Sequence, residues 1–308
     1  MIDICLLGSG ATLPTPERGL SAAILRCGGR AILFDCGEGT QCALRREHFS
    51  PVRIDLIALS HYHGDHIFGL PGLLQSMSCM ERQSPLYITG PVGLQEAMEP
   101  ILSLAGVQCY DIILLTGNCI SLSALHPRWP AGAAMRPIPT VHRVSSQGYK
   151  FILPRPPRFD PERAREKGVP VREWKRLIAE PEGFVSIGER RVSGRELLGE
   201  ERRGLSLVFS GDTMPCAAIK EAARDTDLLI HDATYGSDED EAQALTYGHS
   251  TFRQAAELAA EARARRLWLT HFSQMLRRPE DYLTNAAAFP GAVCACDGLR
   301  LSLGFEEI

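Results

Sequence analysis

Directly after a short apolar run, this chain carries three imidazoles and one carboxylate within six residues: His61-Tyr62-His63-Gly64-Asp65-His66. Neutral imidazole nitrogen and carboxylate oxygen are the ligands that borderline cations such as Zn²⁺ accept. The apolar run, residues 54–59, is typical of a buried strand. The sequence therefore predicts a metal site in the loop that follows a strand.

The spacing within this stretch suits two cations. His61 and His63 stand two residues apart, so they point to the same side when the segment is extended. Gly64 permits an unusual backbone conformation, which lets the chain turn and aim Asp65 and His66 at a second position. Ions in two-metal sites lie about 3.5–4 Å apart. A lone histidine would more simply be a surface residue, but six residues of this composition favour a metal loop.

Further histidines and aspartates follow other apolar runs. Residues 135–141 lead to His142, residues 205–211 to Asp212, residues 228–230 to His231-Asp232, and residues 267–270 to His271. Short apolar runs of this kind indicate buried strands. Because functional sites gather where sheet strands end, we expect these side chains to converge on the metal loop.

Strand-like and helix-like segments alternate along the chain, as in layered α/β folds. Strands are predicted at residues 2–7, 22–26, 31–34, 56–59, 86–89, 111–115, 205–209, 228–230 and 267–270. Helices are predicted at residues 41–48, 67–80, 93–104 and 252–264. The surroundings of Cys294-Ala295-Cys296, residues 292–301, are also strand-like, which favours structural cysteines over a third metal site.

Residues 154–204 differ from the rest, being rich in Pro, Arg and Glu with only short amphipathic pieces. We expect an arm or flap with little core of its own, inserted into one domain. Residues 143–203 hold 15 Lys and Arg against 10 Asp and Glu, whereas the remainder holds 18 against 27. This excess of positive charge suits either a solvated face or a partner with a phosphate backbone.

Composition indicates a globular protein of the cytoplasm. The chain has 308 residues, of which 44% are hydrophobic and 23% charged, so it can bury a large core. No apolar stretch reaches the roughly 18–20 residues that span a bilayer, and Met1 leads straight into a predicted strand. Ten cysteines without paired spacing suit a reducing compartment better than a disulfide framework.

The candidate ligands can be divided between two ions by their chemistry. One metal would take His61, His63 and His142, the other would take Asp65, His66 and His271, and Asp212 would bridge both. A bridging carboxylate balances part of the four positive charges. Two such cations lower the pKa of a shared water and stabilise charge on an attacked phosphoryl group, which favours hydrolysis of an ester or phosphodiester.

Proton transfers need groups beside the metals. Asp65 would touch both a metal and the water, so it can orient the nucleophile or receive its proton. His249, in Gly248-His249-Ser250-Thr251, can donate a proton to the leaving oxygen, and Asp232 can hold its imidazole. The alternative for His249 is a plain residue at a helix start. Asp35 either accepts a hydrogen bond from a metal-binding side chain or belongs to a plain turn.

Together these residues resemble the ribonuclease Z family of the metallo-β-lactamase fold superfamily. His142, Asp212 and His271 follow the metal loop in the expected order, and further motifs extend over nearly the whole chain: Leu7-Gly8-Ser9-Gly10, Phe34-Asp35-Cys36-Gly37-Glu38-Gly39-Thr40-Gln41, Gly69-Leu70-Pro71-Gly72-Leu73-Leu74, Ser210-Gly211-Asp212-Thr213, His231-Asp232-Ala233-Thr234, His249-Ser250-Thr251 and Leu269-Thr270-His271-Phe272-Ser273.

The resemblance implies an α/β fold, the αβ/βα four-layer sandwich of metallo-β-lactamases, as a single domain over residues 1–308 with residues 154–204 as a protruding arm. It implies two Zn²⁺ per subunit, other divalent metals being possible. It further implies a cytoplasmic homodimer that removes 3′ trailers from precursor tRNA, held by the arm. Asp65 matches the family's proton acceptor, His249 its proposed acid, and Asp232 a position where glutamate is usual.

Two segments depart from the family pattern. Gly168-Val169-Pro170 is followed by Val171-Arg172, where a glycine-proline pair is common, and the loop at residues 14–19 keeps Arg18 without the usual lysine and asparagine. RNA docking and the preference for 3′ ends therefore stay open. The alternatives are a phosphodiesterase of the same fold acting on other or smaller nucleic acids, and a non-catalytic RNA-binding protein. A thioester hydrolase of the same superfamily is disfavoured, because the basic arm would then have no function.

Overall fold

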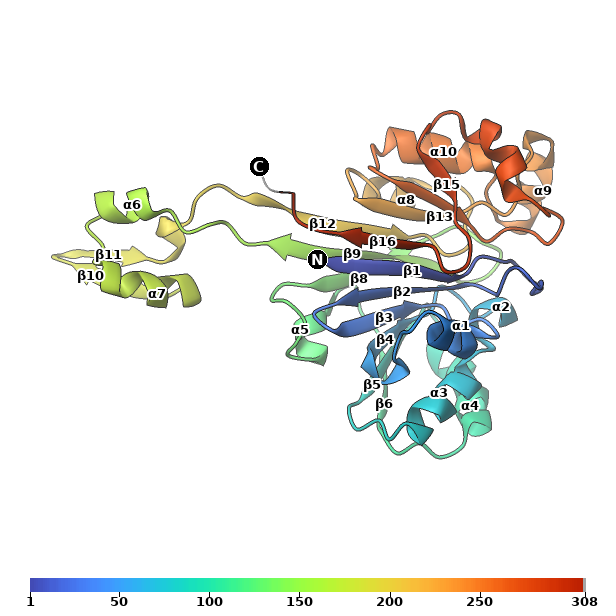
Figure 1. Ribbon diagram of the computed structural model, residues 1–308, viewed down its shortest axis with the longest axis horizontal. Coiled ribbons are helices and arrows are strands. Elements are labelled where there is room, and N and C mark those ends of the chain that lie inside the picture. Colours follow the sequence, from blue (N-terminus) through green and yellow to red (C-terminus); the bar gives the residue numbers. More distant parts are fainter. Residues whose placement is uncertain (307–308) are drawn as a thin grey trace. The chain divides into compact units, whose positions relative to one another are not determined.

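The computed structural model describes residues 1–306 and divides the chain into two compact units. The larger unit comprises Met1–Leu153 and Leu205 onward, and the smaller unit comprises Pro154–Gly204. The larger unit contains two seven-stranded sheets (Figure 1).

The first sheet has the strand order β16-β1-β2-β3-β4-β5-β6. Its strands are β1 (Ile2–Gly8), β2 (Ala22–Cys27), β3 (Arg30–Phe34), β4 (Ile54–Ala58), β5 (Leu86–Thr89), β6 (Ile112–Leu115) and β16 (Arg300–Leu303). Strands β16, β1, β2 and β3 pair antiparallel, whereas β3 to β6 pair parallel. The parallel part gives β4 the buried central position that its apolar sequence predicts.

The second sheet has the strand order β15-β14-β13-β12-β9-β8-β7. Its strands are β7 (Ile120–Ser121), β8 (Ala134–Pro139), β9 (Gln147–Arg155), β12 (Arg202–Phe209), β13 (Leu228–Asp232), β14 (Leu267–Thr270) and β15 (Ala292–Cys294). Strands β12 to β15 pair parallel. Their carboxyl ends therefore lie at one edge of the sheet.

Helices cover the outer face of each sheet (Figure 1). On the first sheet these are α1 (Thr40–Arg46), α3 (Leu70–Cys79) and α4 (Leu94–Ala105), and on the second they are α8 (Ala217–Ala222) and α10 (Phe252–Glu261). Between the sheets lies an apolar core that includes Ile4, Phe34, Tyr149 and Phe209. The four layers, helix–sheet–sheet–helix, confirm the predicted αβ/βα fold.

Shorter helices fill the connections: α2 (Gly64–Ile67), α5 (Leu122–Leu125), α9 (Glu241–Tyr247), η1 (Pro51–Arg53), η3 (Asp238–Asp240) and η4 (Pro279–Ala286). Across residues 1–306, none of the helices combines the length and the apolar character that crossing a bilayer would need.

Two predicted segments are interrupted in the structure. The helix expected at residues 67–80 is divided into α2 and α3, because Pro71 lies in the first turn of α3 and cannot donate a backbone hydrogen bond. The strand-like segment at residues 292–301 contributes β15 to the second sheet and β16 to the first. Local sequence did not reveal that the chain changes sheets there.

The smaller unit is built from α6 (Pro161–Glu166), α7 (Val171–Ala179), the hairpin β10 (Phe184–Ile187) with β11 (Arg190–Ser193), and η2 (Arg195–Leu197). Its core is small, with five buried side chains: Ala164, Val169, Leu177, Val192 and Leu197. The side-chain carboxylate of Asp160 caps the amino end of α6. The unit therefore has little apolar core of its own.

A buried ion pair joins β3 to β4, next to the metal loop in sequence. The Arg30 guanidinium donates two hydrogen bonds to Asp55, which also accepts the Trp129 indole N–H at 2.8 Å. Asp55→Ala should lower the free energy of unfolding by about 3–5 kcal/mol, because it leaves a buried guanidinium without a partner. Urea unfolding would measure this. Asp3→Ala, which breaks an exposed pair with Arg26, should cost less than about 1 kcal/mol, and equal losses would contradict the expectation.

Candidate metal centre

The predicted ligands come from the loops that follow four strands. His61, His63, Asp65 and His66 follow β4 in the first sheet. In the second sheet Asp212 follows β12, and His271 directly follows β14. Since β12, β13 and β14 run parallel, the ends of these strands meet at one edge, as the apolar runs predicted. His142 lies after β8.

Four of these residues form one group of ligand atoms. His61 Nε2 lies 2.9 Å from His63 Nδ1, and His142 Nε2 lies 3.4 Å from the same atom. Asp212 Oδ2 lies 3.7 Å from His61 Nε2. All four donor atoms are within 4.8 Å of one another. Three imidazole nitrogens and a carboxylate aimed at one point are a donor set that fits a divalent cation.

A second group lies beside the first. His271 Nε2 lies 3.3 Å from His66 Nε2 and 3.4 Å from Asp65 Oδ2. Asp212 Oδ2 is 3.3 Å from His66 Nε2 and 3.4 Å from His271 Nε2, so this carboxylate contacts both groups. The structure thus places all seven predicted ligands close together. A third, overlapping group with ligand atoms within 4.8 Å of one another consists of Asp212, Asp232, His249 and His271.

Hydrogen bonds orient four of the ligand imidazoles. His66 Nδ1 donates to Asp35 at 2.8 Å, so Asp35 orients a predicted ligand and is more than part of a turn. Ser60 Oγ donates to Asp35 and accepts from His61 Nδ1 at 3.0 Å. His142 Nδ1 donates to the Gly248 carbonyl at 2.8 Å, and His271 Nδ1 lies 3.0 Å from Thr234 Oγ1. In each case Nε2 is left to face the cluster.

Burial and neighbouring charges set the protonation of the cluster. Burial, together with the charge of His66, lowers the pKa of His61 well below its ordinary value, and burial also lowers the pKa of His63. Burial alone would raise the pKa of Asp212, but His271 and His66 hold it well below the usual range. Neutral His61 and His63 beside an ionised Asp212 are in the forms that bind a cation. Burial would also lower the pKa of His66, but Asp212 and Asp35 instead raise it well above its ordinary value.

His249 and Asp232 form a pair at the edge of this cluster. His249 Nδ1 lies 2.8 Å from Asp232 Oδ2. Burial would lower the pKa of His249, but the charge and hydrogen bond of Asp232 raise it to about 9. Asp232 also accepts from the Thr213 and Thr234 backbone N–H groups. The aspartate therefore reaches the histidine despite being shorter than the glutamate that is usual in the resembled family.

Three contacts at the site lack a clear sequence signal. The Thr12 backbone N–H donates to Asp65 Oδ2 at 2.7 Å, from the turn that follows β1. Thr234 Oγ1 donates to Asp232 Oδ1 at 2.7 Å while it contacts His271. The Gly248 carbonyl is a backbone atom that any residue would carry. Of the three contacts, only that of Thr234 could be suspected from the sequence, because Thr234 stands two residues after Asp232.

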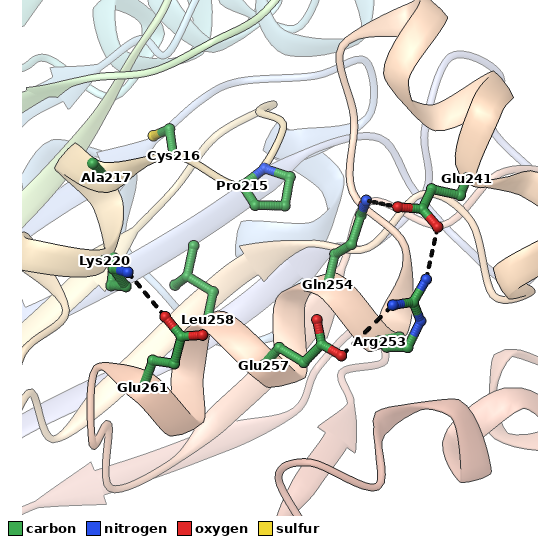
Figure 2. Close-up of a pocket in the computed structure, with 10 residues that line it drawn as sticks. All are labelled: Pro215, Cys216, Ala217, Lys220, Glu241, Arg253, Gln254, Glu257, Leu258 and Glu261. Atoms are coloured by element: carbon green, nitrogen blue, oxygen red, sulfur yellow. Dashed lines mark hydrogen bonds and ion pairs between the residues drawn. The ribbon is translucent and has the colours of Figure 1, made fainter.

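The cluster opens into a cleft of about 870 Å³, the active-site cleft, whose wall includes His63, Asp65, His142, Asp212, His249 and His271. A second cleft, of about 370 Å³, lies between α8, α9 and α10 (Figure 2). Its charges pair within the protein: Lys220 lies 2.9 Å from Glu261, and Arg253 lies 2.7 Å from Glu241 and 3.6 Å from Glu257. The active-site cleft is therefore the one whose ligand groups are available for chemistry.

Comparison with known proteins agrees with this arrangement. Family models match residues 2–100 (anti-Pycsar protein Apyc1) and residues 193–272 (beta-lactamase superfamily domain). Ribonuclease Z of Clostridioides difficile (strain 630) is 37% identical over all of both chains, and that of Lachnospira eligens is 36% identical over all of this chain and 99% of its own.

Solved structures are also similar. Human tRNase Z, short form, is 27% identical with a TM-score of 0.66, over 98% of this chain and 100% of its own. The metallo-β-lactamase fold protein YhfI from Bacillus subtilis shares the fold, with a TM-score of 0.68 at 17% identity over 97% of this chain and 98% of its own. Full-length identity above one third to curated relatives, with the same fold, leads to one conclusion: this chain belongs to the ribonuclease Z family of metallo-β-lactamase fold proteins.

Proposed function

We propose that this protein is a metal-dependent endoribonuclease that removes 3′ trailers from precursor tRNA by hydrolysing one phosphodiester. The observation that carries the proposal is the convergence of seven ligand side chains beside the His249–Asp232 pair, in a member of the ribonuclease Z family. We further propose that the enzyme works in the cytoplasm as a homodimer.

Two Zn²⁺ ions fit the two donor groups. His61, His63 and His142 would hold one, Asp65, His66 and His271 would hold the other, and Asp212 would contact both. When bound, the ions supply positive charge that acidifies water and offsets the charge developing on phosphoryl oxygens.

The protein's own side chains orient the nucleophile and move protons. Asp65 is fixed by the Thr12 N–H, so its carboxylate can orient the attacking water and receive a proton. His249 holds a proton at Nε2 that it can donate to the leaving oxygen. Asp232 fixes that tautomer by accepting from Nδ1.

A precursor tRNA cleavage assay tests the function. We expect a single cut at the trailer boundary with the zinc-loaded protein. Turnover confined to a small model phosphodiester would contradict the tRNA substrate. RNA binding without any cleavage would contradict the enzymatic role.

Thr234 should support metal binding through His271. Its hydroxyl donates to Asp232 and so accepts from His271 Nδ1, which keeps His271 Nε2 free for a metal. Thr234→Val, which keeps the shape but not the hydroxyl, should weaken zinc affinity about 10- to 100-fold. Competition with a chelator would measure this affinity. Thr234→Ser should restore it, and a Ser variant as weak as Val would indicate a packing role instead.

We propose that residues 154–204 form the tRNA-binding arm. Lys175 and Arg190 are exposed cations on α7 and β11. Replacing both with alanine should raise KM for precursor tRNA and reduce the slope of log KM against log salt by roughly two, since each lost phosphate contact removes about one released counterion. Titrating cleavage with salt measures this slope. The matched control is the double variant Arg45→Ala with Arg53→Ala, which removes two exposed cations of the larger unit. If log KM depended equally on log salt in the two double variants, the proposal that residues 154–204 bind tRNA would be contradicted.

A further inference from the structure

The wall of the active-site cleft carries a cation that the chemistry described above does not use. Within residues 1–306, Arg143 is the only lysine or arginine that lines this cleft, which also holds the carboxylates of Glu38, Asp65 and Asp212. An RNA strand entering the cleft therefore meets one positive side chain besides the predicted metal ligands and the proposed proton donor His249. The position of Arg143 therefore influences where an RNA strand lies in the cleft.

Arg143 is held against an aromatic ring and not against a carboxylate. Its guanidinium carbon lies 5.4 Å from the centre of the Tyr247 ring, and no ion pair is formed with Arg143 across the described chain. Tyr247 lines the cleft and is 43% exposed. A guanidinium held over a tyrosine ring by a cation–π contact keeps its charge, and its hydrogen-bond donors stay available to a ligand.

The backbone fixes this pair beside the proposed proton donor. The hydrogen bond from His142 Nδ1 to the Gly248 carbonyl joins the two segments, so Arg143 and Tyr247 flank it. Gly248 has φ of 78°, and a Cβ there would lie 2.9 Å from His142 Nδ1 and 3.1 Å from the Arg143 nitrogen. Glycine thus permits the close approach. His249 follows two residues after Tyr247.

We propose that Arg143 and Tyr247 form a binding site for one nucleotide of the RNA, the nucleotide that carries the leaving oxygen. This inference rests on the proposed function: His249 protonates the leaving oxygen, so the nucleotide that keeps this oxygen lies on the His249 side of the cleft. There the Arg143–Tyr247 pair receives the base, as aromatic and arginine side chains receive unpaired bases of single-stranded RNA.

The test compares precursor tRNAs that lack one base at either side of the cut. For the wild-type enzyme, removing the base from the nucleotide that carries the leaving oxygen should raise KM about tenfold, the effect of losing one stacked base. Tyr247→Ala and Arg143→Ala should each raise KM for the intact substrate about tenfold. With Tyr247→Ala, the missing base should then add little. Tyr247→Phe should restore most of the lost affinity.

The control is Arg53→Ala, which removes an exposed arginine at the opposite end of β4 and should keep the wild-type KM. A base removal that raises KM equally in the wild type and Tyr247→Ala would overturn the inference, as would KM values for both variants equal to that of Arg53→Ala. If the wild type cuts no precursor tRNA, the proposed function itself fails. Analysis of the product ends identifies which nucleotide carries the leaving oxygen.

Discussion

Asp212→Ala should lose both metals and phosphodiester hydrolysis together. The carboxylate lies 3.3 Å from His66 Nε2, 3.4 Å from His271 Nε2 and 3.7 Å from His61 Nε2, so it is the one side chain common to both donor groups. Without it, two divalent cations would face mainly neutral imidazoles with little charge to balance them. We expect cleavage of precursor tRNA to fall roughly 10⁴-fold or more. Zinc content per chain and cleavage rate are measured on the same preparation.

His142→Ala tests the loss of a single metal, because His142 belongs to only one donor group. This variant should lose one metal and activity together, and keep part of its zinc. Circular dichroism and thermal unfolding of both variants establish that the fold persists. Full zinc content in Asp212→Ala would contradict the assignment of this residue as the shared ligand.

His249→Ala should slow cleavage of precursor tRNA about 10²- to 10⁴-fold, the usual range for loss of a general acid. His249 is outside the two predicted ligand sets, so zinc content should stay at the wild-type level. The alkoxide that leaves from RNA is strongly basic and needs a proton as the bond breaks. His249, held by Asp232 with its pKa raised to about 9, carries that proton at neutral pH.

The role as an acid can be separated from a role in packing by changing the leaving group. A p-nitrophenyl phosphodiester releases a stable phenolate that needs no proton, so His249→Ala should slow its hydrolysis much less than that of RNA. Asp232→Asn should act in the same direction with a smaller effect, since it leaves the imidazole in place but weakens its orientation. Equal slowing on both substrates would count against proton donation.

The sequence predicted much of the fold and which candidate ligands lie close together, because both depend on local patterns. Apolar runs followed directly by His142, Asp212 and His271 marked strand ends, and the helix–strand alternation indicated the α/β layers, which the structure confirms. The predictions from local sequence were wrong at two places. Pro71 divided an expected helix, and residues 292–301 contributed to two different sheets.

The amino-acid sequence by itself determined the candidate side chains for binding a cation or carrying a proton, because the chemistry belongs to the residue type and its place at a strand end. Only the tertiary structure decided how those groups are held. The contact of Thr234 with His271, the Thr12 N–H on Asp65 and the cation–π contact of Arg143 with Tyr247 join segments distant in sequence. Their pairing depends on the packing of the two sheets and their loops at one edge, and no local pattern encodes that geometry.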